Sequence, residues 1–463
     1  MSSIFSRRKH SWLSRWFLDF PGRASVLGFA LLILVGTGLL MLPAAAVGPP
    51  VSAMDALFTA TSAACVTGLI VLDTGSDFTL FGQGVILMLI QIGGLGIMTL
   101  SILFLLVAGT RPGLMERTVI RQDFSPSEQV NPADILRVVV LLTLGIEAAG
   151  AALLFPVFRN DFSTPVALYQ AGFHAVSAFC NAGFSLFPDS LSGYGDHPLM
   201  NLAVCGLIVS GGIGFLVLLE IGKALRRKRR RWEGLSLHAK MAISATVFLL
   251  AGSFVLVLLL EWRHTLADLP LPGKIMAAAF QAVTPRTAGF NTVPIGDLTN
   301  ETLFLFMLLM FVGGSPGSCA GGIKTTTLAC LVLLGFSRLG GHKRPRVFRR
   351  TIPVNTVWRS LQVGLTSGFV VVVGLMLLLI AERGNPSADP NRAQFPELLF
   401  EVVSAFGTAG LSTGATPSLS AGGKLTITAL MYVGRLGPLV LGMAFSRRSA
   451  PRTAYAEENL MIG

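Results

Sequence analysis

Hydrophobic runs of two lengths alternate along the chain. Eight runs approach or exceed the roughly 20 residues that a helix needs to cross a bilayer core of about 30 Å. They cover residues 26–47, 81–107, 134–158, 199–222, 240–262, 301–338 with an interruption, 357–381 and 424–446. Between the two members of each pair lies a shorter run, at 53–67, 166–182, 274–288 and 395–409. These shorter runs cannot span, so we interpret them as re-entrant helices, and the unit long, short, long occurs four times.

The short runs end in a repeated motif. They read TSAACVTGLI (61–70), VSAFCNAGFS (176–185), VTPRTAGFNT (283–292) and VSAFGTAGLS (403–412), with glycines at 68, 183, 289 and 410. Successive glycines are 115, 106 and 121 residues apart, and Ser-Ala stands six and five residues before the glycine in three copies. Four copies at near-equal spacing, each between two long runs, indicate an internal four-fold repeat.

Composition makes the membrane interpretation firm. The chain has 463 residues, of which 52% are hydrophobic and 13% charged. A soluble domain with that balance would lack the polar surface to cover its apolar bulk. We therefore expect an all-α integral membrane protein with eight transmembrane helices. The first 24 residues carry five Lys or Arg and no clear apolar signal region. We therefore expect no cleaved signal peptide, and the first helix should remain in the mature protein.

The repeated motif predicts a cation path. Non-helical backbone is tolerated at membrane depth only where protein buries it or where it lines a water-filled cavity. Carbonyl oxygens from four such segments can replace the hydration shell of a cation, and the C-terminal ends of four short helices add partial negative charge. Without a ring of carboxylates, the segments favour a monovalent cation over Ca²⁺ or Mg²⁺. The five cysteines lie in apolar surroundings and show no metal-site spacing, so no other metal is expected.

Charge predicts the orientation. Lys and Arg number 25 on the side that holds both termini and 7 on the other, which places the termini in the cytoplasm. The basic runs 226–231 and 342–350 then flank spans at the cytoplasmic face. We interpret them as topogenic and lipid-contacting charges, with a surface for a regulatory partner as the alternative, and expect no nucleic-acid binding.

Four further features need weighing. GSPGSCAGGIKTTT, within the sixth long run, is one residue away from a phosphate-binding loop, because Ile323 separates Gly322 from Lys324. Its small residues favour a broken helix that lines the cavity below the filter, with a simple kink as the alternative. Arg435 lies midway along the last span, where it either limits cation flux or pins the broken segment. Glu147 is assigned no transport role, and His174 is expected to pack and to fix the adjacent filter strand at most.

The four-fold repeat resembles the Trk/Ktr/HKT superfamily of potassium transporters over residues from about 20 to 450. FHAVSAFCNAGFS (173–185), GGSPGSCAGGIKTTT (313–327) and GRLGP (434–438) carry the resemblance further. With eight spans, the chain is most similar to the bacterial Ktr membrane subunit. The resemblance implies a plasma-membrane homodimer with one pore per protomer, standing on a cytosolic ring of nucleotide-binding (RCK-type) regulatory subunits. No filter glycine is replaced by Ser, which favours K⁺ over Na⁺ as the transported ion and leaves Na⁺ as an activator.

The resemblance also assigns residues to a filter and a gate. The filter comprises Cys65, Val66, Thr67, Gly68, Cys180, Asn181, Ala182, Gly183, Arg286, Thr287, Ala288, Gly289, Gly407, Thr408, Ala409 and Gly410. The gate comprises Gly313, Gly314, Ser315, Pro316, Gly317, Ser318, Gly321, Gly322 and Arg435. The expected divisions are a tail at 1–24, repeats at 25–110, 111–225, 226–340 and 341–450, and a tail at 451–463.

Two function classes remain. The leading one is a K⁺-selective, channel-like subunit gated from the cytoplasm. The alternative is an alternating-access carrier for Na⁺/K⁺ or H⁺/K⁺, in which broken helices also bind ions at the midplane. Four repeats of one polarity favour the pore, since inverted repeats would place successive copies on opposite sides. No nucleophile–base pair supports an enzyme.

Overall fold

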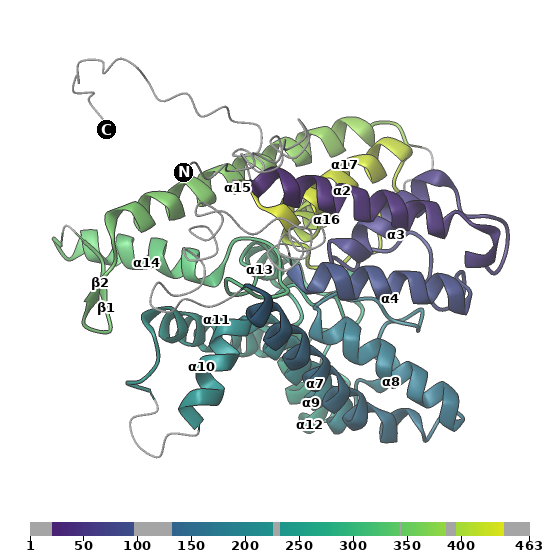
Figure 1. Ribbon diagram of the computed structural model, residues 1–463, viewed down its shortest axis with the longest axis horizontal. Helices are drawn as coiled ribbons and strands as arrows, with labels where there is room; N and C mark the ends of the chain where they lie inside the picture. The colour runs from purple at the N-terminus through teal and green to yellow at the C-terminus, as the bar shows by residue number, and fades with distance from the viewer. Residues whose placement is uncertain (1–20, 97–131, 226–231, 343, 386–394, 439–463) are drawn as a thin grey trace, which may run out of the picture.

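The structure is a computed structural model and describes residues 21–96, 132–225, 232–342, 344–385 and 395–438. These residues are mostly helical (Figure 1). The helices fall into four consecutive groups: α2 (Pro21–Leu40), α3 (Ala53–Ala64) and α4 (Leu80–Gly94); α7 (Pro132–Phe158), α8 (Thr164–Phe179), α9 (Pro198–Ile213) and α10 (Phe215–Leu225); α11 (Leu237–Glu261), α12 (Leu271–Val283), α13 (Asn300–Phe311) and α14 (Thr325–Leu339); α15 (Val354–Ala381), α16 (Phe395–Gly407) and α17 (Ala421–Leu436). Short 3₁₀ turns lie at Pro43–Ala45, Ser192–Tyr194, Ile295–Asp297 and Thr416–Ser418, and a small hairpin pairs β1 (Arg346–Val347) with β2 (Arg350–Thr351).

Several helices have the length and apolarity that a bilayer requires. Among the described residues these are Leu136–Phe158, Leu237–Glu261 and Val354–Ala381, with α9 and α10 as a fourth span if the bent pair is counted as one. Between 17% and 28% of each of the three apolar windows is buried, so most of their apolar side chains face outward, as in a membrane protein. The predicted span 81–107 runs beyond the described residues, and the count of eight therefore remains a prediction.

One of the predicted long spans is bent. The run 199–222 is not a continuous helix, because α9 and α10 meet at an angle of 105°. Gly214 stands at the break with a φ of 97°, a left-handed conformation that favours glycine. A Cβ on Gly214 would also lie 2.7 Å from the carbonyl oxygen of Pro316, so another segment of chain occupies the space beside the bend. The expected interruption of the run 301–338 lies between Phe311 and Thr325.

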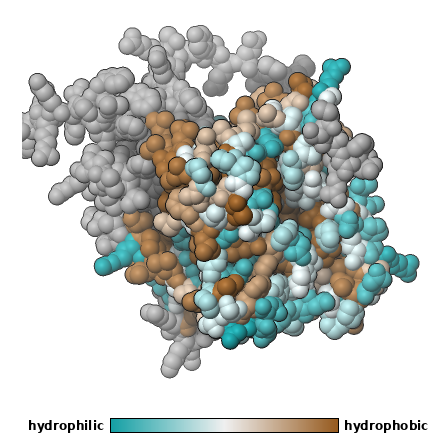
Figure 2. Space-filling view, turned by 90° about the vertical axis from the view of Figure 1, so that its right-hand side faces the viewer, coloured by the Kyte–Doolittle hydropathy of each residue, from teal (hydrophilic) through white to brown (hydrophobic). Residues whose placement is uncertain are grey.

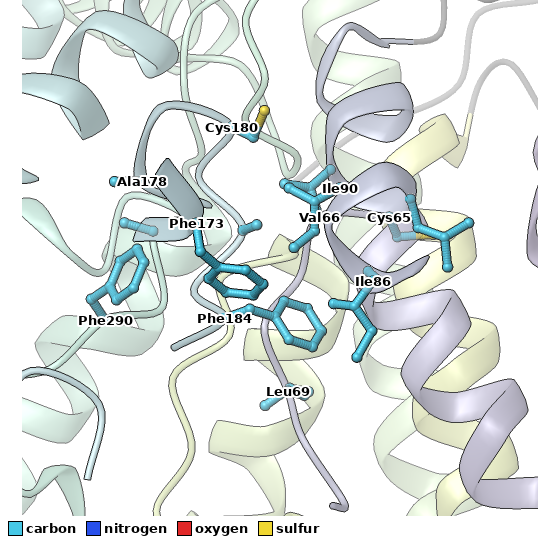
Figure 3. Packing of buried hydrophobic residues seen from close by; sticks show 14 of the residues in the cluster. Cys65, Val66, Leu69, Ile86, Ile90, Phe173, Ala178, Cys180, Phe184 and Phe290 are labelled. Carbon is cyan, nitrogen blue, oxygen red and sulfur yellow. The ribbon is translucent and has the colours of Figure 1, made fainter. Parts of the chain in front are cut away.

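The short helices α3, α8, α12 and α16 lie among the long ones, and their C-terminal halves are buried. The residue that follows each motif glycine is a large apolar side chain with an exposure of 0% or 1%: Leu69, Phe184, Phe290 and Leu411. Figure 3 shows three of these beside Phe173 and Ile86 in the largest core cluster. Burial of these side chains anchors the chain just beyond each glycine.

The fourth group of helices closes on the first. Helix α17 packs against α3, and Lys424 Nζ lies 2.7 Å from Asp55 Oδ1. Figure 1 shows α2 and α17 side by side, and the Tyr432 hydroxyl donates to the carbonyl oxygen of Val26 at 2.5 Å. The end of the molecule facing the viewer in Figure 2 mixes hydrophilic and hydrophobic residues. The predicted tail 451–463, most of the tail 1–24 and the basic run 226–231 lie outside the described residues.

Candidate functional site

Three of the four short helices end in the same hydrogen-bonded turn. At the end of α3, Val66 has a φ of 55° and the Thr67 N–H donates to the Ser62 carbonyl oxygen at 2.8 Å. A bond across five residues with a left-handed residue inside it is a Schellman-type helix end. The bond recurs in α8 and α16, from Ala182 to Ser177 at 2.7 Å and from Ala409 to Ser404 at 2.8 Å. The third repeat differs, since Ala288 N–H donates to the Thr284 carbonyl at 3.0 Å.

Each repeat places a non-glycine residue in the left-handed region two positions before its glycine. These residues are Val66, Asn181, Thr287 and Thr408, with φ values of 55°, 58°, 68° and 50°. The glycines follow with φ values of 96°, 71°, 77° and 79° at positions 68, 183, 289 and 410. A left-handed conformation costs a non-glycine residue about 1–2 kcal/mol. The same costly geometry in all four repeats indicates that the surrounding structure holds these segments in place.

The four glycines form a closed ring in the order of the repeats. A Cβ on Gly68 would lie 2.5 Å from the carbonyl oxygen of Ala182, the residue before the glycine of the second repeat. The same relation links the second repeat to the third at 2.8 Å, the third to the fourth at 2.9 Å, and the fourth back to the first at 2.0 Å. The four segments, far apart in sequence, therefore meet backbone to backbone. Only glycine leaves room for this approach.

The first residue of each four-residue segment does not follow one pattern. Cys65, Cys180 and Gly407 are small, whereas Arg286 is a charged side chain with an exposure of 5%. Arg286 Nη2 lies 3.4 Å from Thr246 Oγ1, and its Nε has no partner among the described residues. Cys180 Sγ lies 3.8 Å from Glu147 Oε1, so this carboxyl lies directly behind the second segment, a position that the sequence did not predict. None of the sixteen filter residues is a carboxylate.

A second set of glycines packs close to the ring segments and the short helices, and the sequence analysis did not identify it. These are Gly93, Gly211, Gly313 and Gly434, which stand 25, 28, 24 and 24 residues after the four ring glycines. A Cβ on three of them would come within 1.8 to 2.0 Å of carbonyl oxygens at the C-terminal ends of the short helices, at Ala64, Phe179 and Phe406. The sequence does contain a motif that could have identified them, because three of these glycines begin a Gly-x-x-Gly motif that ends at Gly96, Gly214 and Gly437.

The broken segment between α13 and α14 is tied to α9. Ser315 N–H donates to the Gly212 carbonyl at 2.9 Å, and Cys319 N–H donates to the Gly211 carbonyl at 3.1 Å. These carbonyls belong to the last turn of α9, which has no intrahelical donors for them. In return, Phe215 N–H, at the start of α10, donates to the Gly317 carbonyl at 2.9 Å. The bend at Gly214 and the broken segment therefore satisfy each other's backbone groups.

The same segment lies against the third and fourth segments of the ring. A Cβ on Gly321 would lie 2.1 Å from Thr408 Oγ1, and one on Gly313 would lie 3.3 Å from Thr287 Cγ2. Within the segment, Ser315 Oγ and Thr325 Oγ1 are 2.9 Å apart, and Ala320 N–H donates to Ser318 Oγ at 3.3 Å. Gly317 and Gly322 have positive φ values of 69° and 63°. The expected gate residues therefore form one compact loop beside the ring.

Arg435 joins this loop to the first repeat. Its exposure is 6%, and its guanidinium donates to the carbonyl oxygens of Cys319 and Gly93. It follows Gly434 at the position that glycine occupies in the other three repeats, at 94, 212 and 314. A Cβ at Gly94 or Gly314 would lie 2.4 Å from Cys180 Sγ and 2.6 Å from the Gly212 carbonyl oxygen, so a side chain is accommodated at this position in the fourth repeat and not in those two. The two carbonyl partners of Arg435 fit both a flux barrier and a structural pin.

Comparisons with known proteins agree with this geometry. Residues 29–452 match the TrkH family, which is described as "Cation transport protein". The chain is 39% identical over 451 residues to Ktr system potassium uptake protein B of Bacillus subtilis, covering 97% of this chain and 98% of the relative. It is 37% identical to the potassium/sodium uptake protein NtpJ of Enterococcus hirae, covering 96% and 97%.

A solved structure shares the fold. The crystal structure of the potassium transporter TrkH from Vibrio parahaemolyticus superimposes with a TM-score of 0.73, covering 95% of this chain and 86% of that one at 20% identity. At that identity the likeness concerns the fold. The family match and the full-length relatives carry the assignment: this chain is a transport protein rather than an enzyme, and it belongs to the TrkH family of cation transport proteins.

Proposed function

We propose that the chain is the ion-translocating subunit of a K⁺ uptake system, with channel-like permeation through a filter of backbone carbonyls. The closed ring of four glycines carries this proposal. Each ring glycine approaches the carbonyl oxygen of the residue that precedes the ring glycine of the next repeat. The backbones of the four segments therefore surround a common axis. A dehydrated K⁺ ion needs such a set of carbonyl oxygens.

The absence of carboxylates from the sixteen filter residues favours a monovalent cation over a divalent one. K⁺ is the transported ion that the names of the relatives suggest, and the name of the Enterococcus hirae protein adds Na⁺. We propose Na⁺ as an activator or a second ion. All four ring positions are glycine and none is Ser, so no side chain at these positions obstructs the carbonyl groups that would bind K⁺.

The loop at 313–322 and Arg435 form the gate in this proposal. The loop holds the last turn of α9, touches Thr287 and Thr408, and accepts a bond from Arg435. Opening requires these contacts to be exchanged for others, a change of a few kcal/mol between two packings. A cytosolic partner needs only that much differential binding energy to open the path.

The wider assembly follows the same proposal. Eight spans and four re-entrant helices form the protomer, both termini are cytoplasmic, and two protomers form a homodimer in the plasma membrane. An RCK-type nucleotide-binding ring gates the pore from the cytoplasm, and basic cytoplasmic segments contact anionic lipids. The B. subtilis relative is named as part of a Ktr system, which supports a partner subunit.

K⁺ uptake into uptake-deficient cells tests this proposal, with and without a candidate ring subunit. We expect uptake that rises when the ring is present. Shortening the loop by removing Pro316–Ala320 should raise ring-independent uptake while leaving the preference for K⁺ over Na⁺ unchanged. If the shortened chain is folded and dimeric and its ring-independent uptake stays low, the loop is a hinge and the gate lies elsewhere.

The carrier alternative makes a different prediction. An alternating-access carrier would bind the ion within inverted repeats and would couple the movement of K⁺ to that of Na⁺ or H⁺. The four repeats share one polarity and close into one ring, which favours the pore. K⁺ flux in proteoliposomes that follows the electrochemical gradient without a counter-ion is the result expected of the pore, and obligatory coupling to Na⁺ or H⁺ would support the carrier.

A further inference from the structure

Two buried polar side chains occupy the same position in the second and fourth short helices. His174 in α8 and Glu401 in α16 each stand nine residues before their ring glycines, Gly183 and Gly410. Both have an exposure of 0%. Neither belongs to the filter or to the gate described above.

Glu401 holds the chain just beyond the fourth glycine. Its Oε1 accepts hydrogen bonds from Ser412 Oγ at 2.7 Å, Thr413 N at 3.0 Å and Thr413 Oγ1 at 3.3 Å. Its Oε2 accepts a further bond from Thr416 Oγ1. A carboxylate accepts without donating, so four donors match this side chain in its ionised form. One side chain thereby fixes the segment that starts two residues after Gly410.

His174 holds the matching place in the second repeat. Its Nδ1 lies 2.8 Å from the Gln170 carbonyl oxygen and therefore carries the proton. Its Nε2 lies 3.4 Å from Leu186 N and 3.1 Å from Ser185 Oγ. Because the Leu186 N–H can only donate, Nε2 accepts and the ring is neutral. Ser185 stands two residues after Gly183, as Ser412 does after Gly410.

The other two repeats lack this tether. Nine residues before their glycines they carry Thr59 and Phe280. The Thr59 Oγ1 is buried and has no partner among the described residues, and Phe280 has no polar atom on its side chain. Since the repeats follow one another around the ring, the two tethered strands face each other across it. The third strand is held beyond its glycine by other bonds, because Thr284 Oγ1 donates to the Phe290 carbonyl oxygen and the Asn291 N–H donates to Ser190 Oγ at 3.2 Å. A polar side chain at this one helix position therefore supports only the two opposite strands.

We propose that Glu401 and His174 are positioning residues that set the carbonyl spacing of the filter and so its discrimination between K⁺ and Na⁺. This inference rests on the proposed K⁺ conduction. The filter segments of repeats 2 and 4 are held at one end by the Schellman-type bonds of α8 and α16 and at the other by these tethers. A strand fixed at both ends cannot contract around the smaller ion, and the loss of either support would allow it to do so.

The test compares the ratio of K⁺ to Na⁺ uptake among variants in proteoliposomes at equal amounts of folded protein. Glu401→Ala should lower the ratio about tenfold, which corresponds to roughly 1.4 kcal/mol of lost discrimination. Glu401→Gln retains an acceptor for Ser412 and Thr413 and should stay within about twofold of wild type. His174→Ala should lower the ratio several-fold. Thr59→Val is the matched control, because it removes a hydroxyl without a partner at the equivalent position, and it should leave the ratio unchanged.

A folded Glu401→Ala protein with the wild-type ratio overturns the inference, as does a Thr59→Val protein whose ratio falls equally. If Glu401→Ala does not fold, Ser185→Ala decides the matter, because it removes a partner of His174 together with the bonds of Ser185 Oγ to the Ser190 carbonyl oxygen and from the Phe187 N–H, which hold the same strand. A fall of about threefold supports the tether, and an unchanged ratio overturns it. Wild-type protein that takes up no K⁺ at all overturns the proposed function itself, a distinct result.

Discussion

Alanine at the four ring glycines should impair K⁺ uptake in a graded order. Each substitution places a Cβ on a residue with a left-handed φ, which costs about 1–2 kcal/mol, or a factor of about 5–30 in an equilibrium. The steric term differs between the sites. The new Cβ would lie 2.0 Å from the Thr67 carbonyl oxygen at Gly410, 2.5 Å from its neighbour at Gly68, 2.8 Å at Gly183 and 2.9 Å at Gly289. A carbon–oxygen approach of 2.0 Å requires the backbone to move, and that movement displaces a carbonyl group of the next segment.

We therefore expect the half-saturating K⁺ concentration to rise most for Gly410→Ala and least for Gly289→Ala. Uptake kinetics in K⁺-uptake-deficient cells, normalised to the amount of protein in the membrane, measure this. Gly172→Ala is the control, because Gly172 lies within the short helix α8 and its Cβ would have no atom within 4 Å. If Gly410→Ala and Gly289→Ala both show the half-saturation of Gly172→Ala at equal abundance, the approach of the segments does not set ion affinity.

Three further changes test other contacts. Arg435→Ala removes a charge beside the ring and should raise K⁺ uptake or loosen selectivity, whereas a loss of folded protein alone would favour the structural pin. Glu261→Ala should lower the stability of detergent-solubilised protein by about 1–3 kcal/mol, because Glu261 accepts from Thr299 N at 3.0 Å and Thr299 Oγ1 at 2.7 Å at the start of α13; an unchanged melting temperature would contradict this. Burial acts to raise the pKa of Asp55, but hydrogen bonds from Lys424 and Ser52 outweigh it and hold that pKa below its ordinary value. The stabilisation is therefore present above a pH of about 4 and is lost as the pH falls through the lowered pKa. Melting temperatures between pH 5 and pH 3 should fall more for wild type than for Lys424→Met, and parallel curves would refute the link.

The glycine repeat was predictable because it depends on local backbone chemistry. A left-handed residue and a glycine must stand at fixed distances from each helix end, so Gly68, Gly183, Gly289 and Gly410 recur in one motif. The same reasoning located the short helices to within a few residues of their ends. It also identified the loop at 313–322 as non-helical, because its small residues cannot sustain a helix.

The bend at Gly214 and the tethers could not be predicted in the same way. Gly214 stands in an apolar run that is long enough to span, and glycine is needed there because of its φ of 97° and its approach to Pro316, both of which depend on the tertiary structure. The tether position carries four different residues in the four repeats, so no motif marks it. Glu401 and His174 become equivalent only when their partners, Ser412 and Ser185, are seen two residues beyond each glycine.

The closure of the fourth repeat on the first has a consequence for biosynthesis. The contacts that complete the ring join residues at the two ends of the described chain: Asp55 and Lys424 are 369 positions apart, and Val26 and Tyr432 are 406 apart. Contacts of such high sequence separation form late, and chains are made from the N-terminus onward. A nascent chain that holds three repeats therefore has an open ring, without the Thr67–Gly410 approach that completes it. A subunit that stalls or is truncated before the last repeat therefore lacks the closed ring of four segments, and under the proposed function it has no complete ion path.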